Sequence, residues 1–142
     1  DASAVSENVK STLLRKNFAH IAMANPVTAP YGKAALQTLQ KLDLWDQLQP
    51  LIVQGENIGQ TFQFIFSKNV ELGFVAVSQV LDPKNIQKGK RADVPDGYYD
   101  PLKQDVVVLK KGKINHGARD LWQFLRSNLA KRIIKKYGYG LP

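Results

Sequence analysis

Residues 20–41 read HIAMANPVTAPYGKAALQTLQK: an apolar run, a turn and an amphipathic stretch. Residues 20–24 suit a buried strand, and residues 25–30 contain the asparagine and proline residues that are typical of a turn. Residues 31–41 carry apolar side chains at helical spacing. These side chains are Ala34, Ala35, Leu36 and Leu39. The stretch therefore predicts a strand, a loop and a helix, the unit from which α/β sheets are built.

A second unit with the same pattern follows. Residues 51–53 form an apolar run, residues 55–57 a turn, and residues 58–67 an amphipathic stretch rich in phenylalanine. Residues 72–77 predict a third strand. Successive units of this kind predict an α/β lobe with a mainly parallel sheet flanked by helices.

The C-terminal third of the chain has a different composition. Residues 82–101 are rich in proline, glycine, lysine and aspartate, which predicts a long loop and a boundary. Residues 105–109 (DVVVL) predict a central strand buried on both faces. After Asn115, basic and apolar residues interleave in the manner of amphipathic helices. The acidic residues of the loop are interpreted as solvated, namely Asp93, Asp96 and Asp100.

Composition narrows the possible functions. The chain has 142 residues, of which 44% are hydrophobic, so it can form a compact domain with a core. It has no cysteine, which removes thiolate catalysis and zinc–cysteine sites. His20 and His116 lie far apart and are interpreted as structural, and Ser78 has no nucleophile context. We therefore expect neither an enzyme nor a metal site.

The formal charge of +8 favours anionic partners. Nucleic acid is one class of anion, but the chain has no RNA-binding aromatic motif and no zinc-finger spacing. A small anion fits two places in the sequence better. Tyr31 and Gly32 follow the first loop, and Asn57 and Ile58 follow the second, so both pairs lie at predicted helix starts. Backbone N–H groups are unpaired at such starts and the helix dipole is positive there.

Several strings resemble the periplasmic molybdate-binding proteins of ABC importers. The strings are ANP at 24–26, APYGKAA at 29–35, LWD at 44–46, GENI at 55–58, LGFV at 72–75 and IKKYGY at 134–139. Their order and spacing match from Phe18 to Pro142. The resemblance implies a periplasmic receptor that binds molybdate or tungstate without a cofactor and delivers it to the membrane subunits of an ABC importer.

The resemblance also implies roles for particular residues. Tyr31 and Ile58 correspond to backbone N–H donors to the anion, with Gly32 and Asn57 beside them as further candidates. Family members often contribute a tyrosine hydroxyl at the position that is Ala76 here. That contact is therefore expected to be absent or to come from elsewhere, with the Tyr31 side chain as one candidate.

By the same resemblance, residues 1–17 are a crossover segment, residues 18–103 are the second, anion-binding lobe, and residues 104–142 finish the first lobe with a strand and helices. The serine or threonine donors of the first lobe would precede Asp1. An alternative function follows: a lobe that binds no anion and acts through protein association. Its partner would be the remaining first-lobe segment or a second copy of the chain, and no nucleic acid is expected.

Overall fold

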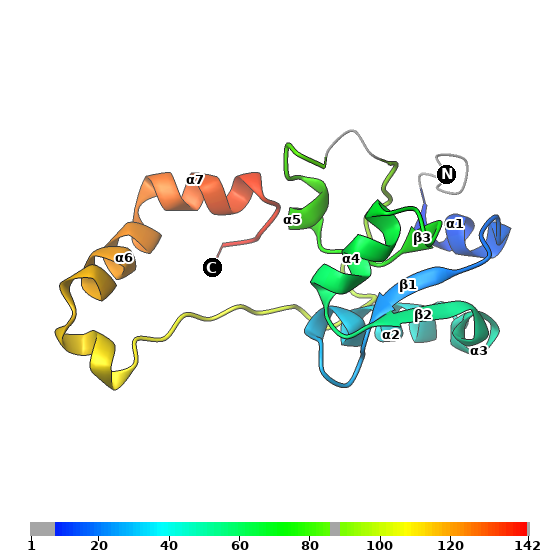
Figure 1. The fold of residues 1–142 in the computed structure, drawn as a ribbon, viewed down its shortest axis with the longest axis horizontal. Coiled ribbons are helices and arrows are strands. Elements are labelled where there is room, and N and C mark those ends of the chain that lie inside the picture. The colour runs from blue at the N-terminus through cyan, green and yellow to red at the C-terminus, as the bar shows by residue number, and fades with distance from the viewer. Residues whose placement is uncertain (1–7, 86–88, 142) are drawn as a thin grey trace.

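A three-stranded parallel sheet forms the centre of the computed structural model, which describes residues 8–85 and 89–141 (Figure 1). The strands are β1 (Ile21–Ala24), β2 (Ile52–Gly55) and β3 (Leu72–Gly73), in the order β2-β1-β3. Ile21 is in register with Ile52 on one side and with Leu72 on the other. All four residues of β1 are buried, as expected for a central parallel strand. The predicted parallel sheet is confirmed.

Helices lie on both faces of this sheet. The flanking elements are α1 (Val9–Arg15), α2 (Pro30–Lys41), α3 (Trp45–Leu48), the 3-10 turn η1 (Gln49–Leu51), α4 (Ile58–Phe66) and α5 (Val77–Val80). Ile21 and Met23 join a core cluster with Ala35 and Leu39 of α2. Ala22 points to the opposite face, where α4 packs closely. A side chain at Gly73 would meet both the Ala22 methyl group and Ile65 of α4.

Two element boundaries differ from the sequence prediction. Helix α2 begins at Pro30 rather than Tyr31, because proline suits the first helical position. Strand β3 ends at Gly73, whereas the sequence predicted a strand over residues 72–77. The chain turns away after Val75, and Ala76 becomes the N-cap of the short helix α5. Apolar composition therefore indicated the start of this strand correctly and its length incorrectly.

The predicted loop is confirmed over the part that the structure describes, residues 82–85 and 89–101, which contains no helix or strand. Although its composition is that of a solvated loop, part of it packs on the lobe. Ala92, Val94 and Tyr98 pack against the core cluster. The loop therefore covers the lobe as well as connecting it to the C-terminal region.

Residues 104–141 form a C-terminal arm, which leaves the lobe as an extended segment and returns toward α5 (Figure 1). The arm contains the 3-10 turn η2 (Lys110–Ile114), α6 (His116–Arg126) and α7 (Asn128–Lys136). Side-chain N-caps define both helix starts. The Asn115 side chain accepts a hydrogen bond from Ala118 N at 3.2 Å, and Ser127 Oγ accepts one from Ala130 N at 3.2 Å. The predicted helices after Asn115 are confirmed.

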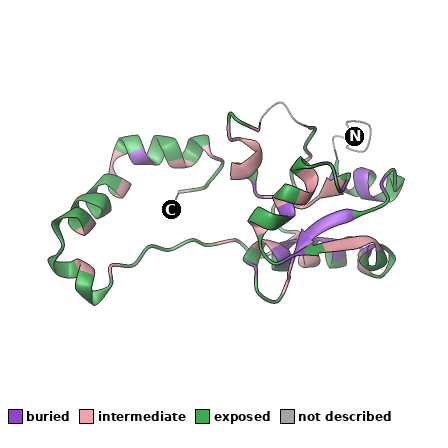
Figure 2. Cartoon of the chain, viewed as in Figure 1, coloured by how far each residue is buried: buried purple, intermediate pink, exposed green. Residues whose placement is uncertain are grey.

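The predicted central strand at residues 105–109 is wrong. This segment is extended but pairs with no strand of the described chain, and Val107 is 76% exposed. A strand requires a neighbour for its N–H and C=O groups. The three strands of the sheet lie in the lobe, from which the arm departs. Figure 2 shows the consequence, since almost the whole arm is exposed while the buried residues gather around β1.

The first helix belongs structurally with the lobe. Val9 and Leu13 of α1 lie in the same core cluster as Phe18. Residues 1–7 of the predicted crossover segment, and residue 142 at the end of the arm, lie outside the described residues. The division at residues 17 and 103 stays a prediction.

Candidate functional site

Two loops leave the sheet at one edge, because β1 and β2 are parallel neighbours. Strand β1 ends at Ala24 and β2 ends at Gly55, and Asn25 N donates to Gly55 O at 2.8 Å across the two ends. The first loop leads into α2 and the second into α4. The carboxyl edge of a parallel sheet is where α/β proteins usually bind ligands.

The first loop leaves the start of α2 without a side-chain cap. Asn25 closes the loop by accepting hydrogen bonds from Val27 N at 2.9 Å and from Ala29 N at 2.9 Å. Ala29 is the N-cap and offers no side-chain acceptor. Among the described residues, no acceptor is found for the N–H groups of Tyr31 and Gly32. These donors are therefore available to a ligand.

Gly32 lets α2 approach the end of β1. A Cβ atom at this position would lie 2.3 Å from Ala24 O and 2.6 Å from Asn25 O, which no side chain tolerates. Gly32 is also buried. Close packing of α2 on the end of β1 therefore requires glycine at this position. The contact of the Gly32 N–H group with an anion stays a prediction.

The second loop provides a different helix start. Asn57 is the N-cap of α4, and its Oδ1 accepts a hydrogen bond from Gln60 N at 3.0 Å. The side chain of Gln60 also binds the residue before this cap, because its Oε1 accepts a hydrogen bond from Glu56 N at 2.7 Å. The N–H group of Ile58 finds no acceptor within the described chain. Asn57 therefore positions the start of α4, and its own contact with an anion stays a prediction.

A cavity of about 500 Å³ joins the two helix starts, since Tyr31 and Ile58 both line it. Most of its wall is apolar, including Phe62 and Val75. Such a wall suits an anion poorly, because an ion loses hydration there without compensation. The candidate anion site is therefore assigned to the parts of the cavity wall formed by Tyr31 and Ile58, where backbone N–H donors are available.

The phenol group of Tyr31 is influenced by two other tyrosines, Tyr139 and Tyr99. Burial raises the pKa of Tyr31 to about 12, and a hydrogen bond with Tyr139 and the nearby Tyr99 add to the rise. Tyr139 Oη also lies 3.1 Å from Ser78 Oγ. The sequence interpretation missed Ser78 and Tyr139 as site neighbours. The available signal was the string at residues 134–139, which is part of the family resemblance.

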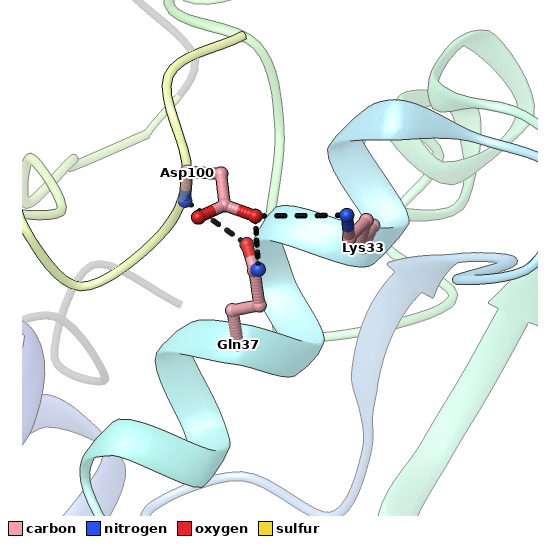
Figure 3. A network of polar contacts seen from close by, with 3 residues as sticks. All are labelled: Lys33, Gln37 and Asp100. Carbon is pink, nitrogen blue, oxygen red and sulfur yellow. Dashed lines mark hydrogen bonds and ion pairs between the residues drawn. The ribbon is translucent and has the colours of Figure 1, made fainter.

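A polar network supports α2 from the surface of the lobe (Figure 3). Gln37 Nε2 donates to Asp100 Oδ2 at 2.6 Å, Asp100 N donates to Gln37 Oε1 at 3.0 Å, and Lys33 Nζ lies 3.6 Å from Asp100 Oδ2. Asp100, interpreted from sequence as merely solvated, is exposed but holds the end of the loop on α2. The network fixes the helix whose first turn carries Tyr31.

The described residues contain no group of three or more His, Asp or Glu side chains able to hold a metal ion. His20 lies at the start of β1, where its backbone N donates to Glu71 Oε2 at 3.1 Å, and His116 begins α6. No helix in residues 8–85 and 89–141 is long and apolar enough to cross a membrane.

Comparisons with known proteins show what this chain is similar to. Residues 3–140 match the family model for bacterial extracellular solute-binding proteins. The molybdate-binding protein ModA of Azotobacter vinelandii is 45% identical over 93% of this chain and 53% of its own length. A Bacillus subtilis lipoprotein, assigned by its name to substrate binding for an ABC transporter, is 29% identical over 84% of this chain and 45% of its own length.

The fold is also found in a solved structure. The periplasmic molybdate-binding protein of Azotobacter vinelandii superimposes with a TM-score of 0.86 at 34% identity, covering 95% of this chain and 59% of that one. The chain spans about half the length of the curated relatives it matches. The α/β lobe, the paired helix starts and these similarities lead to one conclusion: the chain belongs to the bacterial extracellular solute-binding protein family.

Proposed function

We propose that this chain binds a tetrahedral oxyanion, molybdate or tungstate, through the backbone N–H groups of Tyr31 and Ile58. One observation carries the proposal: two helices that follow the carboxyl ends of neighbouring parallel strands begin with available N–H groups, and Tyr31 and Ile58 in these helix starts both line one cavity. The similarity to molybdate-binding proteins supports the choice of anion.

The chemistry of this site is binding without covalent change. Each helix start presents N–H donors and the positive end of a helix dipole, which together favour an anion over a neutral ligand. Hydrogen bonds from neutral donors hold the anion without a covalent bond, so its release requires no chemical step. Gly32 and Asn57 complete the proposed set, Gly32 by close packing and Asn57 by capping α4.

We extend the proposal to the setting of the protein. A periplasmic receptor that delivers its anion to the membrane subunits of an ABC importer is supported by the family and by the names of the relatives. Within such a receptor, residues 18–103 would be the anion-binding lobe, residues 1–17 a crossover, and residues 104–142 a part of the other lobe. The separation of the arm from the sheet supports this division.

Calorimetric titration tests the proposal. We expect sodium molybdate and sodium tungstate to bind to the chain at one site, and sulfate to bind more weakly, because a smaller anion leaves some donors beyond hydrogen-bonding distance. Chloride at matched ionic strength controls for screening. The proposal is wrong if neither molybdate nor tungstate gives heat or raises the melting temperature at millimolar concentration.

A second candidate function, protein association through the arm, is favoured by a specific observation. Helices α6 and α7 expose large apolar side chains along their length, as does the segment at residues 105–109. Large contiguous apolar patches on protein surfaces mark interaction sites. The partner would be a first-lobe segment or a second copy of the chain.

A further inference from the structure

The end of α7 makes a sharp turn that directs the chain back to the lobe. Tyr137 is the C-cap, and Gly138 follows with a φ of 81°, a conformation that glycine adopts readily. Gly138 N donates to Lys135 O at 2.9 Å, and Tyr139 N donates to Ile134 O at 3.2 Å. This pair of bonds is a Schellman motif. The motif fixes the direction in which Tyr139 leaves the helix.

Gly138 also allows the turn to pack closely on α5. A Cβ atom at Gly138 would lie 2.5 Å from Val77 Cγ1 and 3.1 Å from Leu81 Cδ1. The backbone of the turn therefore packs directly on the apolar side of α5. Although most of the arm is exposed, its last residues make a defined contact with the lobe.

Tyr139 extends this contact to the candidate site. Its hydroxyl group lies 3.1 Å from Ser78 Oγ on α5, and Tyr139 is the side-chain partner that, after burial, contributes most to the raised pKa of Tyr31 in the first turn of α2. Helix α5 is itself joined to the start of α4, because Gln79 Nε2 donates to Ile58 O at 3.0 Å. The three segments around the site are thus connected through one group of side chains.

We propose that Tyr139 is a positioning residue for the anion site: through the hydroxyl cluster of Tyr139, Ser78 and Tyr31, the end of the arm holds the first turn of α2 in place for binding. This inference rests on the proposed function, since it assigns a role around the same site. It also assigns the arm a role in binding, because the arm carries Tyr139.

The chemistry of the cluster suits this role. Hydroxyl groups are uncharged, so they can restrain Tyr31 beside an anion without repelling it, whereas a carboxylate would repel it. Fixing the Tyr31 ring also restricts the backbone of the first turn. A preorganised donor binds more tightly than a mobile one, because less conformational freedom is lost on binding.

The test compares Tyr139→Phe with Tyr137→Phe, each titrated with sodium molybdate by calorimetry. Tyr139→Phe keeps the ring and removes the hydroxyl, and we expect affinity about two- to tenfold lower, the effect of one hydrogen bond. Tyr137→Phe makes the same change two residues away. The hydroxyl group of Tyr137 forms no hydrogen bond with the described residues. It should bind like the parent chain.

A spectroscopic measurement separates positioning from general destabilisation. In an alkaline titration followed by tyrosinate absorbance, Tyr139→Phe should lower the pKa of Tyr31 below about 12, because the contribution of Tyr139 is lost while that of burial remains. Ser78→Ala should also weaken binding. The double variant should bind molybdate no more weakly than Tyr139→Phe alone, since both changes break the same hydroxyl cluster.

Each failure has its own signature. If the parent chain binds molybdate and Tyr139→Phe binds it equally well, the positioning role is overturned while the proposed function stands. If the parent chain does not bind molybdate or tungstate, the proposed function fails and the positioning role fails with it. An unchanged pKa of Tyr31 in Tyr139→Phe would equally overturn the inference, because the cluster would then not restrain Tyr31.

Discussion

A single backbone N–H group at Ile58 can be removed without shortening α4. Ile58 is the first helical residue, where proline is tolerated, and Asn57 has φ −152° and ψ 172°, which suits a residue before proline. We expect Ile58→Pro to weaken molybdate binding by about 1.5 to 3 kcal/mol, the contribution of one hydrogen bond to a charged group. Calorimetry measures the loss, and an unchanged circular dichroism spectrum shows that the helix persists.

A matched control exists in the arm. Asn128 is the first residue of α7, and Ser127 before it has ψ 156°, so Asn128→Pro makes the same change at a helix start remote from the site. It should leave molybdate affinity unaltered. Normal binding by Ile58→Pro would show that the anion lies elsewhere. Loss of binding by substitution of Lys135 and Lys136 would then indicate the basic end of the arm.

Asp100 makes stability depend on pH in a defined direction. Its hydrogen bond from Gln37 lowers the pKa of the carboxyl, Lys33 lowers it further, and slight desolvation opposes the shift. Because the folded pKa lies below the unfolded value of about 3.9, the stabilisation is present above that pH and is lost as the pH falls through the lowered value. The side chain is exposed, so we expect a small effect.

Asp100→Asn should therefore lose less stability than the parent chain when the pH falls from 7 to about 3, as measured by urea denaturation midpoints. Asp96→Asn is the control, because Asp96 is exposed in the same loop and forms no ion pair with the described residues. Parallel pH dependence in the parent and in Asp100→Asn would contradict the role assigned to the network.

At the scale of elements, the junction of β1 with α2 depends on Gly32. Gly32→Ala would place a methyl group against backbone atoms of Ala24 and Asn25, which cannot move as a side-chain tip can. We expect a loss of about 1 to 3 kcal/mol in the free energy of unfolding, as for other overpacked positions, and weaker anion binding because the first turn of α2 shifts. Denaturant unfolding and calorimetry measure the two effects.

Gly117→Ala is the control for this substitution. Gly117 also lies in the first turn of a helix, α6, and the nearest atom to an added Cβ is Asn115 Oδ1 at 3.3 Å. There the change should be neutral or slightly stabilising, since alanine favours a helix over glycine. Equal stability of the Gly32→Ala variant and the parent chain would show that α2 does not require the close contact.

At the scale of the whole molecule, the arm exposes apolar side chains to solvent. Leu121 is 56% exposed and Phe124 is 43% exposed on α6, and Ile133 on α7 is 43% exposed. We expect the purified chain to associate with increasing concentration and to bind a dye that reports apolar surface. Light scattering and dye fluorescence measure both properties.

Variants in the arm make this prediction specific. The pair Leu121→Gln and Phe124→Gln should reduce association and dye binding together, because it removes apolar area from α6. Lys131→Gln on α7 changes a charge but little apolar surface, and should leave both readouts near those of the parent chain. A strictly monomeric parent chain that binds no dye at high concentration would exclude the association function.

The sequence by itself determined the lobe and both helix starts. The strand–loop–helix units are local, so the apolar spacing of residues 20–41 and the capping residue Asn57 were sufficient to place α2 and α4. The parallel direction of the strands also followed, because a helix that connects two strands returns the chain to the same edge. Tyr31 and Ile58 could therefore be identified as candidate donors from their positions at these two helix starts.

Only the tertiary structure decided the features that depend on residues distant in sequence. Residues 105–109 have the composition of a buried strand, yet they stay exposed because no described strand pairs with them. Asp100 contacts Gln37, and Tyr139 reaches Ser78 and Tyr31, across separations that no local pattern encodes. Local propensity fixes a helix or a turn, but the partner of a side chain depends on how the whole chain folds back on itself.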